Sequence, residues 1–469
     1  MASGALRGIR RSNFSNFRPN RKIIMPSGTD IKTRIELYPL LGSIAAATDL
    51  VSPILVNHHR RVTFIAAALG ETLGLAQEEL RRLILAAAVH DIGGLTVVTR
   101  LEAFEFEVDN PSRHTLPGAA LLASFAPFAE LARVVRFHHL YWQHGRGGAE
   151  EGEEVPRLSH ILHLADRVAV QLDPAREILA QQRGVVARIK DGSGEMFAPD
   201  QIEAFLDLAG REAFWLDLTS PAVGAILERR FPLAAVEFDR GQLLALAEMF
   251  RRLIDFRSRF TATHSSGVAA VAAALAGLSG FMPADPDRIM IAGLLHDIGK
   301  LVVPAEILEK RQGLASEDFA VIYKHPYYTG EILRPITGFE DIGQWGSLHH
   351  ERLDGTGYPY RMKGEELPLG ARILAVADTF TALMEDRPYR CGISPAGTER
   401  IMRDMVEYHR LDRDYVALIQ ENIGEINDRR HEAQLAANQA HLRFLEECRL
   451  LDGRPEVADR CPVSSHGQA

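Results

Sequence analysis

The chain contains one arrangement of histidines and aspartates twice, and this repeat restricts its fold more than any other feature. His58 precedes His90 by 32 residues, and His264 precedes His296 by the same interval. Without a gap, the residues before His90 align with those before His296 at a constant offset of 206. Self-similarity at a fixed spacing indicates a duplicated structural unit. We therefore predict two copies of one fold.

The other members of the pattern recur in the same order. A third histidine precedes a His-His pair by 24 residues in both copies, and an aspartate follows the pair by 27 residues in the first copy and 28 in the second. A lone buried histidine is more often a hydrogen-bonded core residue than a ligand, but an ordered set on inward helix faces is how helical bundles build metal sites. The first copy has His58, His90, Asp91, His114, His138, His139 and Asp166, and the second has His264, His296, Asp297, His325, His349, His350 and Asp378. We predict a metal site in the second copy and a candidate second site in the first.

Helical periodicity dominates the sequence, and the alternation typical of strands is nearly absent. The predicted class is all-α, with two tandem helical bundles joined by a helical linker. The expected helices include residues 31–52 and 243–256. The predicted divisions are a disordered basic tail at 1–30, the first copy at 31–218, the linker at 219–242, the second copy at 243–430, and a helix with a disordered tail at 431–469.

Composition excludes several partners. The net charge is −9, with 53 basic and 62 acidic residues, which argues against a surface for nucleic-acid polymers. Three cysteines are too few for a disulfide framework, so a reducing compartment, the cytoplasm, is expected. The longest uncharged stretch after His264 is mostly alanine with Gly and Ser, so no membrane span is predicted.

The two copies differ beside the expected ligands. In the second copy a glycine-rich loop, Asp354-Gly-Thr-Gly-Tyr-Pro359, follows the His-His pair, and the first copy has no such loop. Lys300 follows the His-Asp pair of the second copy, where the first copy has Gly94. A lysine can neutralise a phosphate oxygen and glycine cannot. The second copy is therefore the expected catalyst.

On these motifs the second copy resembles an HD-GYP domain, a subgroup of the HD superfamily of metal-dependent phosphohydrolases, over roughly residues 253–389. The resemblance rests on His296-Asp297-Ile-Gly-Lys300, His325-Pro326, His349-His350-Glu351-Arg-Leu-Asp354-Gly355-Thr-Gly357-Tyr358-Pro359 and Asp386-Arg387-Pro388-Tyr389-Arg390. It implies a cyclic di-GMP phosphodiesterase with a dinuclear or trinuclear centre of iron or manganese, with cyclic GMP-AMP hydrolysis as a secondary activity. The first copy resembles a plain HD domain, for which we expect a regulatory role.

The resemblance also implies roles for residues. The seven ligand-type residues of the second copy match the metal ligands of the family, with Asp297 bridging. Lys300, Arg387 and Arg390 match positions that contact substrate phosphates, and Gly357, Tyr358 and Pro359 border the pocket. Two departures from the family pattern are Thr381, where an aspartate usually stands near the lysine, and Phe260, where a trinuclear member has a glutamate. We therefore expect two divalent ions.

The predicted reaction is hydrolysis of cyclic di-GMP to pGpG, GMP or both, in which a metal-bridged hydroxide attacks phosphorus. The catalytic residues are Asp297 and Lys300. One alternative is hydrolysis of cyclic GMP-AMP or another nucleotide. Another is a catalytically silent module that binds a cyclic dinucleotide or a protein partner, for which Thr381 is the only hint. Homodimer formation and signalling proteins as partners are left open.

Overall fold

The computed structural model describes residues 32–452, except for 51–55, 95–96, 143–148, 151–152, 258–262, 282–286, 309, 311–314, 335 and 387–390. The two predicted disordered tails lie wholly or mainly outside the described residues. The same holds for Phe260, Arg387 and Arg390. Within the described residues, no helix is long and apolar enough to cross a membrane.

Helices dominate the described residues, which confirms the predicted all-α class. The strands form two short antiparallel pairs, β1 (Thr33–Ile35) with β4 (Val236–Phe238) and β2 (Ala149–Glu150) with β3 (Glu153–Glu154). The first half of the chain contains the helices α1 (Leu37–Asp49), α2 (His58–Thr72), α3 (Gln77–Ala88), α4 (Val97–Ala103), α5 (Ser112–Ala123), η2 (Ala126–Phe128), α6 (Ala129–Arg136), α8 (Arg157–Ala169), α9 (Ile178–Asp191), α10 (Pro199–Ala209), α11 (Glu212–Thr219) and α12 (Val223–Arg230). The second half contains α13 (Arg240–Arg257), α14 (His264–Ser279), α15 (Asp287–Leu295), η3 (Ile298–Val302), α16 (Ala305–Leu308), α17 (Ser316–Ile322), α18 (His325–Leu333), α19 (Glu340–Ser347), η4 (Gly364–Glu366), α20 (Leu369–Met384), α21 (Pro395–Glu407), α22 (Arg413–Glu421) and α23 (Ile423–Asp452).

The predicted helix over residues 31–52 is wrong at its beginning. Residues Thr33–Ile35 form β1, and only Leu37–Asp49 are helical. The pairing with β4, about 200 residues later in the sequence, decides this local structure. Strand formation depends on such distant partners more than on local propensity.

The sequence repeat is a repeat of helix packing. In the first copy α2 packs against α3 and α8, and α5 packs against α6. In the second copy α14 packs against α15 and α20, and α18 packs against α19. In each copy, the repeated histidines lie at or near helix ends, and the last aspartate lies within α8 or α20. The two copies are therefore the same five-helix arrangement.

Glycine after each His-Asp-Ile sequence permits a close helix approach. A Cβ atom added to Gly299 would lie 1.9 Å from the carbonyl oxygen of His325, and one added to Gly93 would lie 2.1 Å from that of His114. Real Cβ atoms do not approach so closely, so only glycine fits here. This contact places the third histidine of each copy beside the His-Asp pair.

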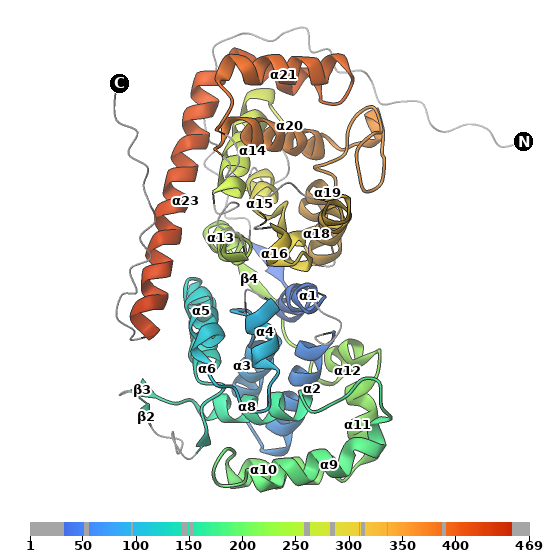
Figure 1. Cartoon of the computed structure of the whole chain (residues 1–469), viewed down its shortest axis with the longest axis vertical. Coiled ribbons are helices and arrows are strands. Elements are labelled where there is room, and N and C mark those ends of the chain that lie inside the picture. Colours follow the sequence, from blue (N-terminus) through green and yellow to red (C-terminus); the bar gives the residue numbers. More distant parts are fainter. Residues whose placement is uncertain are drawn as a thin grey trace, which may run out of the picture.

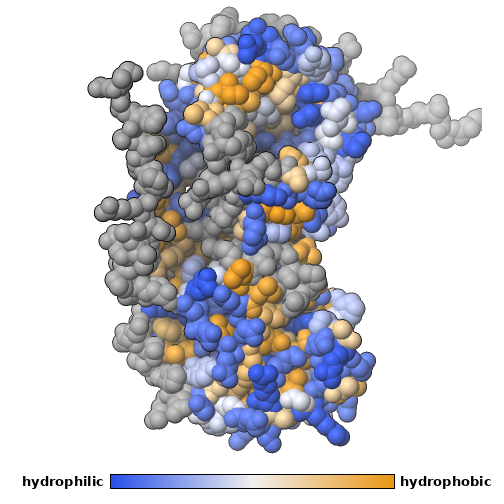
Figure 2. Space-filling model, in the orientation of Figure 1, coloured by the Kyte–Doolittle hydropathy of each residue, from blue (hydrophilic) through white to orange (hydrophobic). Residues whose placement is uncertain are grey.

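Several elements connect the two bundles, which lie one above the other in Figure 1. Helix α1 packs against α2 and α3 of the first copy and also against α18 and η3 of the second. Helix α23 runs along α14 and reaches α5 at its other end. The space-filling view shows a mixed hydrophilic and apolar surface over both halves (Figure 2). Buried apolar side chains form a continuous core through both bundles.

Candidate metal centre

Five elements of the second copy bring the predicted ligands together. His264 begins α14, His325 begins α18, and Asp378 lies within α20. The His296-Asp297 pair directly follows α15, and the His349-His350 pair begins two residues after the end of α19. Their ligand atoms form tight groups, in which all atoms lie within 4.8 Å of one another. The groups are His264 with His296 and Asp378, His325 with His349 and His350, and His296 with Asp297 and His349.

Backbone carbonyl groups orient three of these histidines. The Nδ1 atoms of His296, His325 and His349 lie 2.7, 2.7 and 2.6 Å from the carbonyl oxygens three residues earlier in the chain. Because a carbonyl oxygen only accepts, Nδ1 carries the proton and Nε2 presents its lone pair. Metal-binding histidines are held in this way in proteins. The histidines therefore fit a metal ion through Nε2.

Asp297 lies between two sets of histidines. Its Oδ1 atom is 3.2 Å from Nε2 of His325 and 3.9 Å from Nε2 of His349. Its Oδ2 atom is 3.3 Å from Nε2 of His296 and 2.6 Å from Nζ of Lys300. The two oxygens thus face different groups of ligand atoms. This arrangement suits a carboxylate that is shared by two ions.

A glutamate that sequence reasoning missed holds the first ligand. Nε2 of His264 lies 3.0 Å from Asp378, and its Nδ1 lies 3.0 Å from Oε1 of Glu385. Gln434 of α23 donates a hydrogen bond of 3.1 Å to Oε2 of Glu385. A carboxylate that binds the second ring nitrogen of a metal-binding histidine is common in metal sites, and Glu385 stands in this position to His264. The signal available in the sequence was an acidic residue directly before the motif that begins at Asp386.

The surroundings of the cluster keep Asp297 ionised and His350 neutral. Burial alone would raise the pKa of Asp297, but the Lys300 ammonium and the neighbouring histidines hold it well below its ordinary range. Burial would also lower the pKa of His264, but Glu385 and Asp378 raise it to about 10. Burial and the charge of His325 lower the pKa of His350 to about 3. His350 is therefore neutral at pH 7 and able to bind a metal ion.

In the structure, Lys300 and Thr381 have separate surroundings. The ammonium of Lys300 pairs with Asp297 directly, so it needs no partner at position 381. The hydroxyl of Thr381 is buried and has no hydrogen-bond partner among the described residues. Its methyl group instead lies 3.0 Å from the Cβ position of Gly267. Residue 381 thus fills space beside α14.

The predicted Gly-Tyr-Pro loop lies against the cluster. The backbone N–H of Tyr358 donates to the carbonyl oxygen of His350 at 3.3 Å, and the two rings lie 4.9 Å apart between centroids. The peptide bond between Tyr358 and Pro359 is cis. A Cβ on Gly357 would lie 2.5 Å from the Cα of Glu351, so glycine is required there.

Glu351 fixes the far side of this loop. Its buried carboxylate accepts hydrogen bonds from the backbone N–H groups of Tyr360, Arg361 and Met362 at 2.6, 3.0 and 3.1 Å. The sequence motif includes Glu351, but its role follows only from these contacts. It closes the loop back onto the residue that follows the His-His pair.

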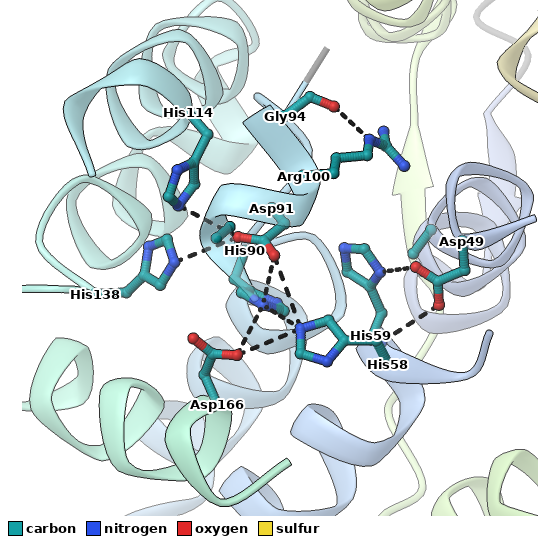
Figure 3. A network of polar contacts seen from close by, with 12 residues as sticks. Asp49, His58, His59, His90, Asp91, Gly94, Arg100, His114, His138 and Asp166 are labelled. Carbon is teal, nitrogen blue, oxygen red and sulfur yellow. Dashed lines mark hydrogen bonds and ion pairs between the residues drawn. The ribbon is translucent and has the colours of Figure 1, made fainter. Parts of the chain in front are cut away.

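The first copy repeats the arrangement around Asp91 (Figure 3). Its Oδ1 atom lies 3.4 Å from Nε2 of His114 and 3.5 Å from Nε2 of His138. Its Oδ2 atom lies 3.3 Å from Nε2 of His90 and 3.7 Å from Nε2 of His58. His139, also predicted, lies 2.9 Å from His114 between Nε2 atoms. The first-copy residues therefore also fit a metal centre.

Arginine 167 distinguishes the two centres. Arg167 is completely buried and pairs with Asp166 at 2.5 Å, while Asp166 Oδ1 lies 3.3 Å from His58. The guanidinium also donates to the carbonyl oxygens of Ala103, Glu105 and Phe106. It thereby ties the segment 103–106 to Asp166, and Phe104 of this segment lies against His58, with 4.5 Å between the ring centroids.

Access to the two centres therefore differs. All seven first-copy candidates are buried, whereas the side chain of His350 in the second copy is 29% exposed and that of Asp378 is 13% exposed. Beside Gly94, the buried Arg100 donates to the glycine carbonyl and to that of Thr48. Among the described residues, only the second-copy centre has a cation, Lys300, that is paired with the shared aspartate and partly exposed. The ligand candidates of the first copy are the more deeply buried set.

Comparisons with known proteins agree with this duplicated site. The HD domain family matches the chain twice, at residues 55–171 and at residues 248–415. The chain belongs to the HD-domain family. Its N-terminal HD domain holds the Asp91 cluster, and its C-terminal HD domain holds the Asp297 cluster.

Relatives match the HD domains to different extents. A 3′3′-cGAMP-specific phosphodiesterase 1 of Vibrio cholerae is 29% identical over 405 residues, which cover 84% of this chain and 93% of that protein. A cyclic di-GMP phosphodiesterase response regulator of Xanthomonas campestris is 35% identical over 166 residues, which cover 35% of this chain and 44% of that protein. A solved structure of a cyclic GMP-AMP-specific phosphodiesterase of V. cholerae has a TM-score of 0.58 and 23% identity, and the match covers 87% of this chain and 98% of that one. The structural likeness supports the tandem fold.

Proposed function

We propose that this protein is a metal-dependent phosphodiesterase that hydrolyses a cyclic dinucleotide in its C-terminal HD domain. The observation that carries the proposal is the position of Asp297. Its two oxygens face separate histidine groups, and Lys300 lies beside it. Relatives that are named as cyclic dinucleotide phosphodiesterases add independent support.

The ligand set fits two divalent ions. His264, His296 and Asp378 would hold one, His325, His349 and His350 the other, with Asp297 between them. Nitrogen and oxygen ligands without thiolate suit iron or manganese. Such ions, when bound, lower the pKa of water and neutralise charge on a phosphodiester. The metal count and identity belong to this proposal.

The residues of the chain contribute binding and charge. The side chain of Lys300 is 17% exposed, so its ammonium can turn from Asp297 to a non-bridging phosphate oxygen. Arg387 and Arg390 remain proposed phosphate contacts outside the described residues. Asp378 and His350 are the partly exposed ligands, so the phosphodiester approaches from their side.

Between the two candidate substrates, 3′3′-cyclic GMP-AMP is favoured over cyclic di-GMP. The relative that matches through both HD domains is named for cyclic GMP-AMP, whereas the cyclic di-GMP phosphodiesterase of X. campestris matches about one domain. Cyclic di-GMP, the substrate expected from the sequence, stays the second candidate. A panel of the two substrates and a mononucleotide control distinguishes them.

The N-terminal HD domain is proposed to be non-catalytic. Its seven candidate ligands are all buried, Arg167 already pairs with Asp166, and Gly94 stands where the second domain has Lys300. Among the described residues, a substrate phosphate therefore meets no partly exposed cation there like Lys300. Its role would be regulatory, as expected from the sequence. A cytoplasmic location and a homodimer also stay predictions.

Matched substitutions in the two domains test this proposal. Protein is purified without oxygen and reconstituted with iron or manganese, and hydrolysis of each cyclic dinucleotide is measured with metal content. We expect His296→Ala to abolish hydrolysis and His90→Ala, the equivalent change in the first domain, to retain it. Loss of hydrolysis in His90→Ala, with hydrolysis retained in His296→Ala, would place catalysis in the N-terminal domain and contradict the proposal. Absence of hydrolysis in a protein with two bound ions would contradict the proposed reaction.

A further inference from the structure

A row of aromatic rings leads away from the C-terminal metal centre. The ring of His350 lies 4.9 Å from that of Tyr358, with an angle of 34° between the planes. Tyr358 lies 4.4 Å from Tyr323 at 30°, and Tyr323 lies 6.1 Å from Phe319 at 48°. The first member is a candidate metal ligand. The row is therefore continuous with the site.

The outer rings of this row are exposed to solvent. Tyr323 is 50% exposed and Phe319 is 42% exposed, whereas Tyr358 is half-buried. Exposed aromatic side chains that gather at a site, and not singly over the surface, mark a binding face. These rings are apolar and their faces are flat. A planar, aromatic part of a ligand is the chemical match for them.

The backbone holds the row in place on both sides. Tyr323 follows α17, and its N–H donates to the carbonyl oxygen of Phe319 at 2.8 Å. Two residues later His325 begins α18 and enters the metal group, so Tyr323 cannot move far from the centre. Tyr358 is held through the loop that Glu351 closes. The stacking surface is therefore formed before a ligand binds.

We propose that Tyr323, with Phe319 beyond it, is the stacking platform for a purine base of the substrate. This inference rests on the proposed function, because it places the phosphodiester at the metal centre and one base along the row. Two ring steps, of 4.9 and 4.4 Å, separate His350 from Tyr323. The platform recognises the face of a purine and not its edge.

A consequence concerns specificity. Guanine and adenine both offer a flat face, and stacking on aromatic side chains tolerates any base. Loss of the platform therefore weakens the binding of cyclic di-GMP and of cyclic GMP-AMP to the same extent. Discrimination between them has to come from groups that contact the base edges.

The test compares Tyr323→Ala with Tyr323→Phe, Phe319→Ala and a control, Tyr408→Ala. Tyr408 is 68% exposed and lies at the end of α21, outside the aromatic row. Each metal-loaded full-length variant is assayed with both cyclic dinucleotides and with methyl 4-nitrophenyl phosphate, a phosphodiester without a base. Metal content is measured for each.

We expect Tyr323→Ala to raise KM for both cyclic dinucleotides by about 5- to 100-fold, in line with stacking on one base, with kcat within about twofold. Tyr323→Phe keeps the ring and should restore KM, and Phe319→Ala should raise it less. Turnover of the base-free ester and metal content should not change. Tyr408→Ala should behave as the wild type.

The outcomes separate this inference from the proposed function. If the wild type hydrolyses a cyclic dinucleotide and Tyr323→Ala keeps its KM, the platform is wrong and the function stands. If Tyr323→Ala loses metal or turns over the base-free ester more slowly, Tyr323 supports the metal centre and the platform is again wrong. A changed oligomeric state with unchanged KM would make the rings a protein interface instead. A wild type that hydrolyses no cyclic dinucleotide refutes both proposals.

Discussion

Replacing Glu351 with glutamine should loosen the loop that carries Tyr358. The buried carboxylate accepts three backbone hydrogen bonds, from Tyr360, Arg361 and Met362. A neutral amide has only one acceptor oxygen, so Glu351→Gln keeps the two bonds to Oε1 and places an N–H group against the N–H of Met362. The change preserves shape and volume. Its effect therefore isolates the carboxylate.

The magnitude follows from these contacts. A hydrogen bond to a charged group contributes about 1.5–3 kcal/mol, and one between neutral groups about 0.5–1.5 kcal/mol. One charged bond is lost and two become neutral, which by these ranges removes about 3.5–6 kcal/mol of local stability. Because 1.4 kcal/mol corresponds to a factor of about 10, the opened state of the loop should become about 300- to 20,000-fold more populated.

Amide hydrogen exchange measures this opening directly. In Glu351→Gln, the exchange rate of peptides that contain residues 352–363 should rise by at least about two orders of magnitude, while peptides from α14 stay protected. Glu366→Gln is the control, because Glu366 is exposed and caps a single backbone N–H, that of Lys363, at 2.8 Å. An increase below about threefold in Glu351→Gln, or an equal increase in the control, would refute the argument.

Three further predictions concern charge. Lys300→Ala removes the cation beside Asp297, so kcat should fall by about 100- to 1,000-fold at unchanged metal content; unchanged turnover would contradict the role of Lys300. Arg167→Ala leaves the buried carboxylate of Asp166 without its partner and should destabilise the N-terminal domain by about 3–5 kcal/mol in urea unfolding. Arg157→Ala breaks an exposed pair and should cost below about 1 kcal/mol. Similar costs for the two variants would contradict the stabilising role of the buried pair. In chelated protein, His350 and other buried histidines have lowered pKa values and stay neutral in the folded state. Below about pH 6.5 the unfolded state therefore binds protons that the folded state does not, so unfolding in urea should become easier from pH 7 to pH 5. Equal stability at the two pH values would contradict the pKa shifts.

The sequence predicted the helical class and the duplicated unit well. Both depend on spacing along the chain, and histidines that begin or end helices keep the same spacing in both copies. The sequence did not predict β1, whose strand partner lies about 200 residues away. It also offered no role for Glu385 or Tyr323. Their contacts, with His264 and with Tyr358, join segments that are distant in sequence.

The sequence by itself thus determined the identity and order of the candidate ligands, because periodic helices place residues at fixed intervals on inward faces. Tertiary structure alone decided which centre is more exposed. The seven candidates of the first copy are buried and Arg167 binds the carbonyl groups of residues 103–106 beside them, whereas the second keeps exposed surface on His350. Burial and long-range hydrogen bonds arise only when the helices pack, so no local pattern in the sequence encodes them.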